Sequence, residues 1–325
     1  MNTPASPRVS VVVRSFRRPD ALKELVAALR AQAHSSFEIV VLEQSDDPGL
    51  VRELEALGDA RLRVIVSPPR NPPAARNEAI RHARGELLLF VDDDDVPLGA
   101  GFIAAHEANY ADPCVMGVVG RLVSSKDGQD PPRFPRVARH FAMRRSFFWD
   151  TRALAHNVLR KDDADFLIGS NASVRRSLVE RIGGWDEGVP MNEELSFSIR
   201  FHRDRRPGER FVFDPTPVLW RRTDVPGGLE RRSREDWYAW ELEARLFYYR
   251  NVVGHYFPMR YRLLAPLFAL RAATMTTGWI WDGDNARRGV LERVRATVDT
   301  FARLPRIAAT PRFSANEVRR GDALK

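Results

Sequence analysis

Four consecutive carboxylates, Asp92 to Asp95, directly follow the apolar segment 87–91. A protein core cannot hold adjacent unpaired carboxylates, so we expect them where a buried strand leaves its sheet and meets solvent, a cation or a ligand. Asp92 and Asp94 are separated by one residue and therefore point the same way. Their oxygen atoms suit Mn²⁺ or Mg²⁺, which one or two carboxylates often hold while substrate phosphates complete the shell. The alternative is a solvated acidic turn, the usual role of a short charge run.

The first 91 residues alternate strand and helix patterns. Buried strands are predicted over residues 9–13, 37–42, 62–66 and 87–91, and helices after Pro19, between Leu50 and Gly58, and between Ala75 and Gly85. This alternation predicts an α/β fold with a mostly parallel sheet flanked by helices. Ligands of such folds bind beyond the carboxyl ends of the strands, which is where the acidic run lies.

Length and composition are those of a globular protein. Of the 325 residues, 44% are hydrophobic, which is enough to bury a large core. Cys114 is the single cysteine, which excludes an intrachain disulfide. Residues 1–7 have neither the basic nor the apolar stretch of a signal peptide. We therefore expect a cytoplasmic location.

Positive charge is concentrated in residues 226–325, where 18 Lys and Arg face 11 Asp and Glu. Pro266, Arg271 and Gly278 interrupt the most apolar part of this region, which argues against a membrane-spanning helix. The basic residues are interleaved with aromatic ones: Trp237, Trp240, Tyr248, Tyr249, Phe257, Trp279 and Trp281. Two interpretations are open. The region either contacts an anionic membrane surface peripherally, at its inner face, or forms helices packed on the main domain with a solvated arginine face.

Several segments, in the expected order, resemble the family 2 glycosyltransferases, which are inverting enzymes of GT-A fold. They are residues 9–19, 75–80, 85–95, 169–176 and 182–187, followed by Asn192-Glu193-Glu194 and Arg200. The resemblance covers residues 8 to about 222 and implies a GT-A type nucleotide-diphospho-sugar transferase fold with a helical C-terminal extension. It also implies transfer of a sugar from a nucleotide-diphospho-sugar donor to a hydroxyl acceptor, a saccharide or lipid-linked saccharide, in polysaccharide or glycolipid biosynthesis.

The resemblance suggests a domain organisation. We expect a glycosyltransferase domain over residues 1–225 and a basic, aromatic-rich helical region over residues 226–325. Within the domain, residues 8–121 would form the nucleotide-binding half and residues 122–225 the acceptor-binding half, with a lid-like insertion.

The insertion, residues 122–165, is rich in arginine and contains Phe147, Phe148 and Trp149. In a lid, these rings would stack on sugar faces while the arginines bind phosphate or an acidic acceptor. The alternative is a helix with an aromatic core face and a basic outer face.

By resemblance, a metal held by Asp92 and Asp94 stabilises the nucleoside diphosphate leaving group, and Asp93 turns toward the ribose or toward residues behind the site. Arg76, placed just before a helix, would pair with phosphate or lock the acidic loop. A purely structural salt bridge is the alternative for Arg76.

Other positions depart from the family pattern. Glu43 replaces the aspartate that usually reads the base, and it could accept a hydrogen bond from uracil, thymine or guanine. Ser15 lies where the base or ribose is often contacted. Arg221 stands where many relatives have a histidine that helps hold metal or pyrophosphate. Arginine cannot ligate a metal but can neutralise phosphate, so dependence on a metal is expected to be weaker.

An acceptor hydroxyl needs a base, and one carboxylate opposite the leaving group suffices. The pair Glu193-Glu194 aligns with the family's Glu-Asp, which puts Glu194 in the position of the base and implies inversion by direct displacement. Glutamate reaches one methylene farther than aspartate, so Glu193 is the alternative base. The structural alternative is that both side chains only complement the dipole of a helix start.

Three other functions are alternatives to sugar transfer. A nucleic-acid-binding protein would explain the basic region, but no recognised binding module is present. A nucleotidyltransferase would need a glycine-rich phosphate loop, and residues 14–18 contain no glycine. An inactive nucleotide-binding scaffold of the same fold has no need to keep Asp92, Asp94 and Glu194.

Overall fold

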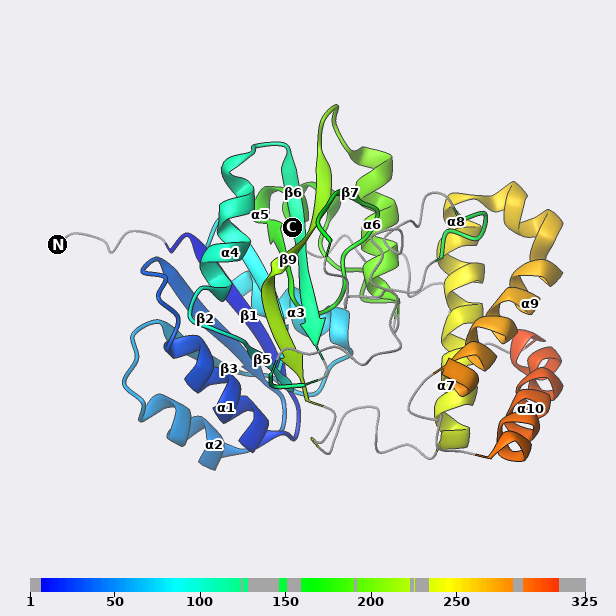
Figure 1. The fold of residues 1–325 in the computed structure, drawn as a ribbon, viewed down its shortest axis with the longest axis horizontal. Coiled ribbons are helices and arrows are strands. Elements are labelled where there is room, and N and C mark those ends of the chain that lie inside the picture. Colours follow the sequence, from blue (N-terminus) through cyan, green and yellow to red (C-terminus); the bar gives the residue numbers. More distant parts are fainter. Residues whose placement is uncertain are drawn as a thin grey trace.

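The computed structural model describes residues 7–123, 125–127, 146–150, 159–189, 192–222, 225, 234–282 and 289–309. Its first part alternates strands and helices as predicted (Figure 1). The elements are β1 (Val9–Ser15), α1 (Pro19–Arg30), β2 (Phe37–Glu43), α2 (Pro48–Glu55), β3 (Leu62–Val66), α3 (Pro72–His82) and β4 (Leu87–Asp92). Each strand and helix expected before the acidic run is therefore present.

The second part of the chain adds strands that run in both directions. Its elements are β5 (Asp95–Pro97), α4 (Phe102–Ala108), the 3₁₀ helix η1 (Asn109–Ala111), β6 (Val115–Val123), β7 (Lys161–Ala164), β8 (Ala172–Arg175), α5 (Arg176–Ile182), α6 (Glu193–Asp204) and β9 (Arg210–Arg221).

The strands form one sheet in the order β3-β2-β1-β4-β8-β6-β9-β5, with β7 also paired to β9. Strands β1 to β4, β6 and β9 run one way, and β5, β7 and β8 run the other. The expected mostly parallel sheet flanked by helices is confirmed. Pairing aligns Ser15 with Glu43 and Arg14 with Asp92, so these four residues lie together at the carboxyl edge.

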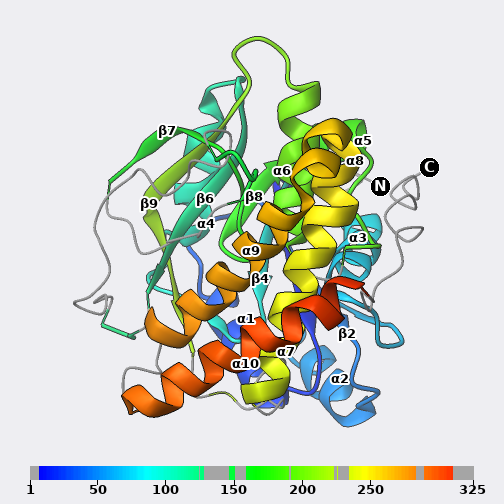
Figure 2. The same cartoon turned by 90° about the vertical axis from the view of Figure 1, so that its right-hand side faces the viewer.

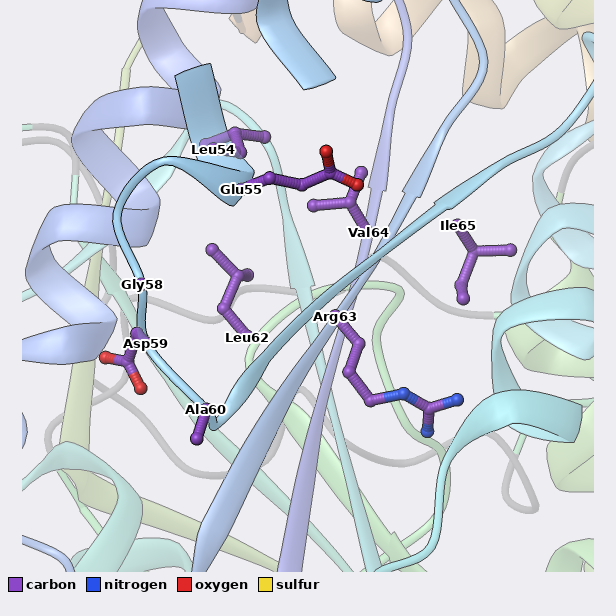
Figure 3. Close-up of a pocket in the computed structure, with 9 residues that line it drawn as sticks. All are labelled: Leu54, Glu55, Gly58, Asp59, Ala60, Leu62, Arg63, Val64 and Ile65. Atoms are coloured by element: carbon purple, nitrogen blue, oxygen red, sulfur yellow. The ribbon is translucent and has the colours of Figure 1, made fainter. Parts of the chain in front are cut away.

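The outer edge of the sheet carries a hollow that does not belong to this group of residues (Figure 3). It is lined by the end of α2, the loop that enters β3, and β3 itself: Leu54, Glu55, Gly58, Asp59, Ala60, Leu62, Arg63, Val64 and Ile65. Two strands, β2 and β1, lie between β3 and β4 in the sheet. The hollow therefore lies away from the acidic run.

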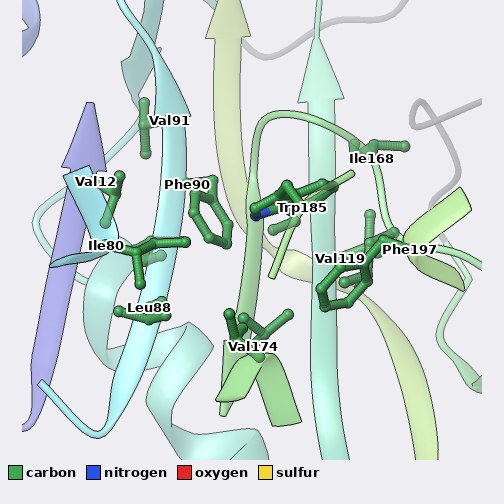
Figure 4. Close-up of a cluster of buried hydrophobic side chains, with 14 of the residues drawn as sticks. Val12, Ile80, Leu88, Phe90, Val91, Val119, Ile168, Val174, Trp185 and Phe197 are labelled. Atoms are coloured by element: carbon green, nitrogen blue, oxygen red, sulfur yellow. The ribbon is translucent and has the colours of Figure 1, made fainter. Parts of the chain in front are cut away.

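The core beneath the carboxyl edge joins the sheet to α6 (Figure 4). The ring of Trp185 stacks on Phe197 of α6, with centroids 4.6 Å apart, and meets Phe90 of β4 edge-on at 5.4 Å. All three rings are buried. This packing fixes the start of α6, where Glu193 and Glu194 lie, relative to β4.

The chain then forms helices: α7 (Arg234–Phe247), the π-helical segment η4 (Tyr248–Val253), α8 (Gly254–Tyr256), α9 (Pro258–Asp282) and α10 (Val290–Ala309). They lie together to one side of the sheet, and α9 and α10 form the outer layer in front of α7 (Figures 1 and 2). The helical C-terminal extension is thus present, while the domain boundary at residue 225 stays a prediction. Among the described residues, no helix is long and apolar enough to cross a membrane.

Most of the described aromatic residues of this helical region form its interior. Trp240, Tyr248 and Tyr249 are buried, and Phe257 stacks on Trp149 with ring centroids 4.6 Å apart. These four rings therefore contribute to packing within the protein, and the predicted membrane contact of the region stays a prediction. The side chains of Trp237, Trp279 and Trp281 lie outside the described residues.

The described part of the insertion packs on the same helices. Residues 146–150 form a turn and not a helix, and Phe148 meets Phe268 edge-on at 5.2 Å. Asp150 is buried and accepts hydrogen bonds from Arg271 Nε at 2.9 Å and from the Tyr249 hydroxyl. The alternative of a helix does not hold for residues 146–150, whereas the sugar-stacking lid stays a prediction, and most of the arginine-rich remainder lies outside the described residues.

Candidate active site

The acidic run forms a turn at the carboxyl edge of the sheet, the acidic turn (residues 92–95), which joins β4 to β5. Asp92 ends β4, Asp93 and Asp94 form the turn, and Asp95 begins β5, which runs back along β9. Carboxylate oxygens of Asp92, Asp94 and Asp95 come within 4.8 Å of one another. The structure therefore brings together the two predicted metal ligands, Asp92 and Asp94, and adds a third carboxylate.

Asp95 is held by other groups. Its carboxylate accepts two hydrogen bonds from Arg221, from Nε at 2.9 Å and from Nη2 at 2.8 Å, and another from the Ser170 hydroxyl. Strand pairing explains the ion pair, because β5 and β9 align Asp95 with Arg221. Asp92 and Asp94 thus supply the oxygen atoms best placed for a cation, and this donor set fits Mn²⁺ or Mg²⁺.

Arginines surround the remaining carboxylates. Arg14 Nη2 lies 3.2 Å from Asp92 Oδ1, and Arg221 Nη2 lies 3.3 Å from Asp92 Oδ2. Arg18 Nη1 bridges Asp93 at 2.9 Å and Asp94 at 2.7 Å. Arg14 and Arg18 were not predicted as site residues. Arg14 lies near the end of β1, where pairing with β4 aligns it with Asp92, and Arg18 lies in the loop that follows β1.

The pKa values of the three acids differ with their surroundings. Burial and the charges of Asp92 and Asp95 raise the pKa of Asp94 to about 7. Burial also raises the pKa of Asp93, which accepts a hydrogen bond from the Phe16 N–H at 3.2 Å. Asp93 is therefore turned toward the protein behind the site. Burial acts in the same direction on Asp92, but the neighbouring guanidinium groups hold its pKa below the usual range.

Arg76 connects the acidic turn to α6. It lies inside α3, whereas the sequence placed it just before a helix. Its guanidinium pairs with Glu193, donates to the Gly169 carbonyl at 3.0 Å and lies 3.9 Å from Asp92. These contacts agree with the predicted locking of the acidic loop and equally with the alternative, a structural salt bridge, so the role of Arg76 stays a prediction.

The two glutamates at the start of α6 have different surroundings. Glu193 is buried against Arg76, whereas Glu194 is partly exposed. Burial, followed by the adjacent Glu193 charge, raises the pKa of Glu194 to about 8. Gly169 makes room for this arrangement, because a Cβ there would lie 2.7 Å from Arg76 Nη2 and would also collide with the Glu194 carboxylate.

Ser15 and Glu43 face each other across β1 and β2. Both are buried, and neither the Ser15 hydroxyl nor Glu43 Oε2 has a hydrogen-bond partner among the described residues. Glu43 Oε1 accepts from the Ser45 N–H at 2.5 Å. Buried polar atoms are normally satisfied, so two orphans at the carboxyl edge fit a ligand that supplies their partners.

Other motif residues position the site. The Asn77 side chain donates a hydrogen bond to the backbone carbonyl of Trp185 and accepts one from the backbone N–H of Trp185, both at 2.8 Å. Arg200 donates to the Ile182 and Gly184 carbonyls at 2.9 and 2.6 Å. Both residues therefore hold the loop before α6 and do not belong to the cluster of acids.

Comparison with known proteins places the chain in a family. Residues 10–183 match the model of glycosyl transferase family 2, and the chain belongs to this family. The mannosyltransferase PcManGT from Pyrobaculum calidifontis, solved in complex with GDP-Man and Mn²⁺, shares the fold. Its TM-score is 0.56 at 20% sequence identity, over 97% of this chain and 86% of that one. The GT-A fold is thereby confirmed.

Two curated relatives match parts of the chain. The pre-mycofactocin glycosyltransferase of Mycobacterium tuberculosis is 24% identical over 217 residues, which cover 66% of this chain and 43% of the relative. The O-antigen biosynthesis protein RfbC of Myxococcus xanthus is 39% identical over 92 residues, which cover 27% of this chain and 7% of the relative. The chain thus spans less than half the length of these relatives.

Proposed function

We propose that this protein is an inverting glycosyltransferase that moves a sugar from a nucleotide-diphospho-sugar donor to a hydroxyl acceptor. The observation that carries the proposal is the link through Arg76 between Asp92 of the acidic turn and Glu193, which directly precedes Glu194 at the start of α6. It holds a cation-binding group and a proton acceptor at one edge of the sheet. Transfer from a diphosphate donor needs both.

The donor nucleotide binds across the carboxyl ends of β1 and β2. The unpartnered Ser15 hydroxyl and Glu43 Oε2 support this placement, since a base and ribose can supply their missing partners. Asp93 fixes the loop of β1 through the Phe16 N–H and Arg18 and contributes to the same subsite indirectly. The Glu43 carboxylate can accept a hydrogen bond from uracil, thymine or guanine alike, so the nucleotide must be found by measurement.

The diphosphate of the donor faces the acidic turn. Asp92 and Asp94 would hold Mn²⁺ or Mg²⁺, which when bound would supply a Lewis acid for the negative charge of the leaving diphosphate. Arg221 adds fixed positive charge beside them, because its side chain stays partly exposed while it pairs with the buried Asp95. A guanidinium there supports a weaker dependence on the metal than the acidic run alone suggests.

Glu194 is the base. It accepts the proton of the acceptor hydroxyl while that oxygen forms a bond to the anomeric carbon and the bond to the nucleoside diphosphate breaks. Attack from the face opposite the leaving group inverts the anomeric configuration. Glu193 is less suited to this role, because Arg76 holds its carboxylate in a buried ion pair.

The acceptor is a saccharide or a lipid-linked saccharide of a polysaccharide or glycolipid pathway, on the cytoplasmic side of a membrane. The O-antigen relative supports such a pathway, and the mycobacterial relative's name shows that acceptors vary among relatives. Residues 1–225 carry the transfer, with residues 226–325 as a helical extension of the domain.

Release of the nucleoside diphosphate tests this proposal without a known acceptor, because water can replace the hydroxyl. Wild type is incubated with UDP-, dTDP- and GDP-sugars and Mn²⁺, beside Asp94→Ala and the matched control Asp20→Ala, whose carboxylate is exposed on α1. We expect one nucleotide class to be turned over by wild type and control and not by Asp94→Ala. Binding without turnover under any condition would favour the inactive scaffold. Turnover that persists in Asp94→Ala would contradict the assigned site.

A further inference from the structure

The outer helix α9 carries an apolar stripe that nothing in the described part of the chain covers. Met259 and Leu263 lie four residues apart before a kink at Leu264, and Leu267 and Leu270 lie three apart after it, so each pair shares a face of its helical segment. All four are exposed, and Leu263 is 72% accessible. The opposite face is buried around Phe268. The helix is thus apolar on both sides.

Helix α10 repeats the pattern. Leu291, Val294, Val298 and Phe301 follow at spacings of three, four and three residues, and all are exposed, Leu291 at 85%. Thr300 is buried on the opposite side, which packs on the other helices. A helix that only packed on the protein would expose polar side chains on this face.

The two helices lie side by side as the outer layer of the molecule, with α7 behind them and the sheet behind α7 (Figure 2). Exposed aliphatic side chains scattered singly need no explanation, but eight at helical spacing on adjacent helices form a patterned surface. Soluble monomers rarely expose large contiguous apolar patches without a partner.

Charge identifies the partner. Residues 258–309 contain nine arginines and no lysine, against four acidic residues. Exposed Arg262 directly precedes Leu263 of the first stripe, and exposed Arg295 directly follows Val294 of the second. Such arginines can lay their apolar stems beside the stripe and extend their guanidinium groups to negative headgroups. Two copies of this face would instead bring like charges together.

We infer that the exposed stripes of α9 and α10, with their flanking arginines, form a docking surface for an anionic lipid membrane. The helices lie in the plane of the interface, with the eight aliphatic and aromatic side chains in the headgroup and acyl boundary. This surface differs from the aromatic residues that the sequence singled out, of which Trp240, Tyr248 and Tyr249 are buried inside the helical region. The inference goes beyond sugar transfer and does not depend on it.

Vesicle flotation tests the inference. Wild type is mixed with vesicles of neutral phosphatidylcholine, or of phosphatidylcholine with phosphatidylglycerol, beside a fourfold variant: Leu263→Glu, Leu270→Glu, Leu291→Glu and Val298→Glu. The matched control is Leu57→Glu, which changes an exposed leucine in the turn after α2. All changed side chains are exposed, so the folds should survive, and equal thermal midpoints check this.

We expect wild type and control to bind the anionic vesicles, with binding that weakens as salt is added, and the fourfold variant to bind at least tenfold less. Nucleotide binding in solution should be equal in all three, which separates this test from that of transfer. Equal vesicle binding by the fourfold variant, or none by wild type, would overturn the inference. So would a dimer in solution that only the fourfold variant fails to form, because the occupant would then be a second copy.

Discussion

Adjacent glutamates at the start of α6 have different surroundings, and we propose different roles for them on that ground. Glu193 is buried in an ion pair with Arg76, and Glu194 stands partly exposed beside it. The sequence could predict that one of them is the base, since both lie in the matched motif. It could not say which, because Arg76 is more than one hundred residues away along the chain and the pair forms only in the fold.

Replacing Glu194 should remove the base and leave the donor site in place. We expect Glu194→Gln to lower kcat by roughly 10²–10⁴-fold, the usual contribution of a general base. Donor binding, measured by calorimetry, should be unchanged. Glu193→Gln is the matched comparison. It should cost more thermal stability, because it leaves Arg76 without its partner, and less activity. A larger loss of kcat in Glu193→Gln would exchange the two roles.

The pH dependence of transfer should report the Glu194 carboxyl. Burial and Glu193 raise its pKa to about 8, so its base form is scarce below that pH and complete above it. We therefore expect kcat/KM to rise about tenfold per pH unit below pH 8 and then level off. Steady-state rates with saturating metal would check this. A flat profile between pH 6 and pH 8 would contradict the assignment of Glu194.

At the scale of elements, the site depends on the pairing of a short strand with a distant one. The sequence predicted the strands before the acidic run and the position of the run at a carboxyl end, since both follow from local apolar patterns. It did not predict β5 or the role of Asp95. Those depend on β9, which aligns Arg221 with Asp95 after a long intervening chain.

The ion pair between Asp95 and Arg221 should stabilise the acidic turn and the pairing of β5 with β9. Asp95→Asn removes the charge and one acceptor of the paired hydrogen bonds while keeping the side-chain size. We expect the free energy of unfolding to fall by about 2 kcal/mol, since the guanidinium keeps only its contact with Asp92 at 3.3 Å and loses its buried partner. Urea denaturation measures the loss. The exposed Asp20→Asn is the control and should change stability by less than about 0.5 kcal/mol. Equal stability of the two variants would show that the pair contributes little.

At the scale of the whole molecule, the C-terminal helices hold part of the insertion between β6 and β7. Composition predicted a basic helical extension, and it is present. It did not predict that the aromatic residues face inward, because aromatic residues beside arginines suit a membrane interface and a protein core equally. Only tertiary packing decides between them. Here the rings of Phe257 and Phe268 pack on residues 146–150.

Loss of the Arg271 contact should loosen this packing. Asp150 is buried and accepts two hydrogen bonds from Arg271, so Arg271→Ala leaves its carboxylate with less compensation. We expect faster amide hydrogen exchange in residues 146–150 and unchanged exchange in β1 and β4. Arg250→Ala, an exposed arginine of η4, is the control. Unchanged exchange at residues 146–150 in Arg271→Ala would mean that the ring contacts alone hold the segment.

The central claim is that the acidic turn binds a metal ion together with a nucleoside diphosphate. Calorimetric titration of UDP, dTDP and GDP, each with and without Mn²⁺, into the intact protein and into Asp94→Ala tests it most directly. We predict tight binding of one nucleotide to the intact protein, strengthened by Mn²⁺, and loss of that strengthening in Asp94→Ala. Binding of none of the three, or binding that is indifferent to Asp94, would contradict the claim.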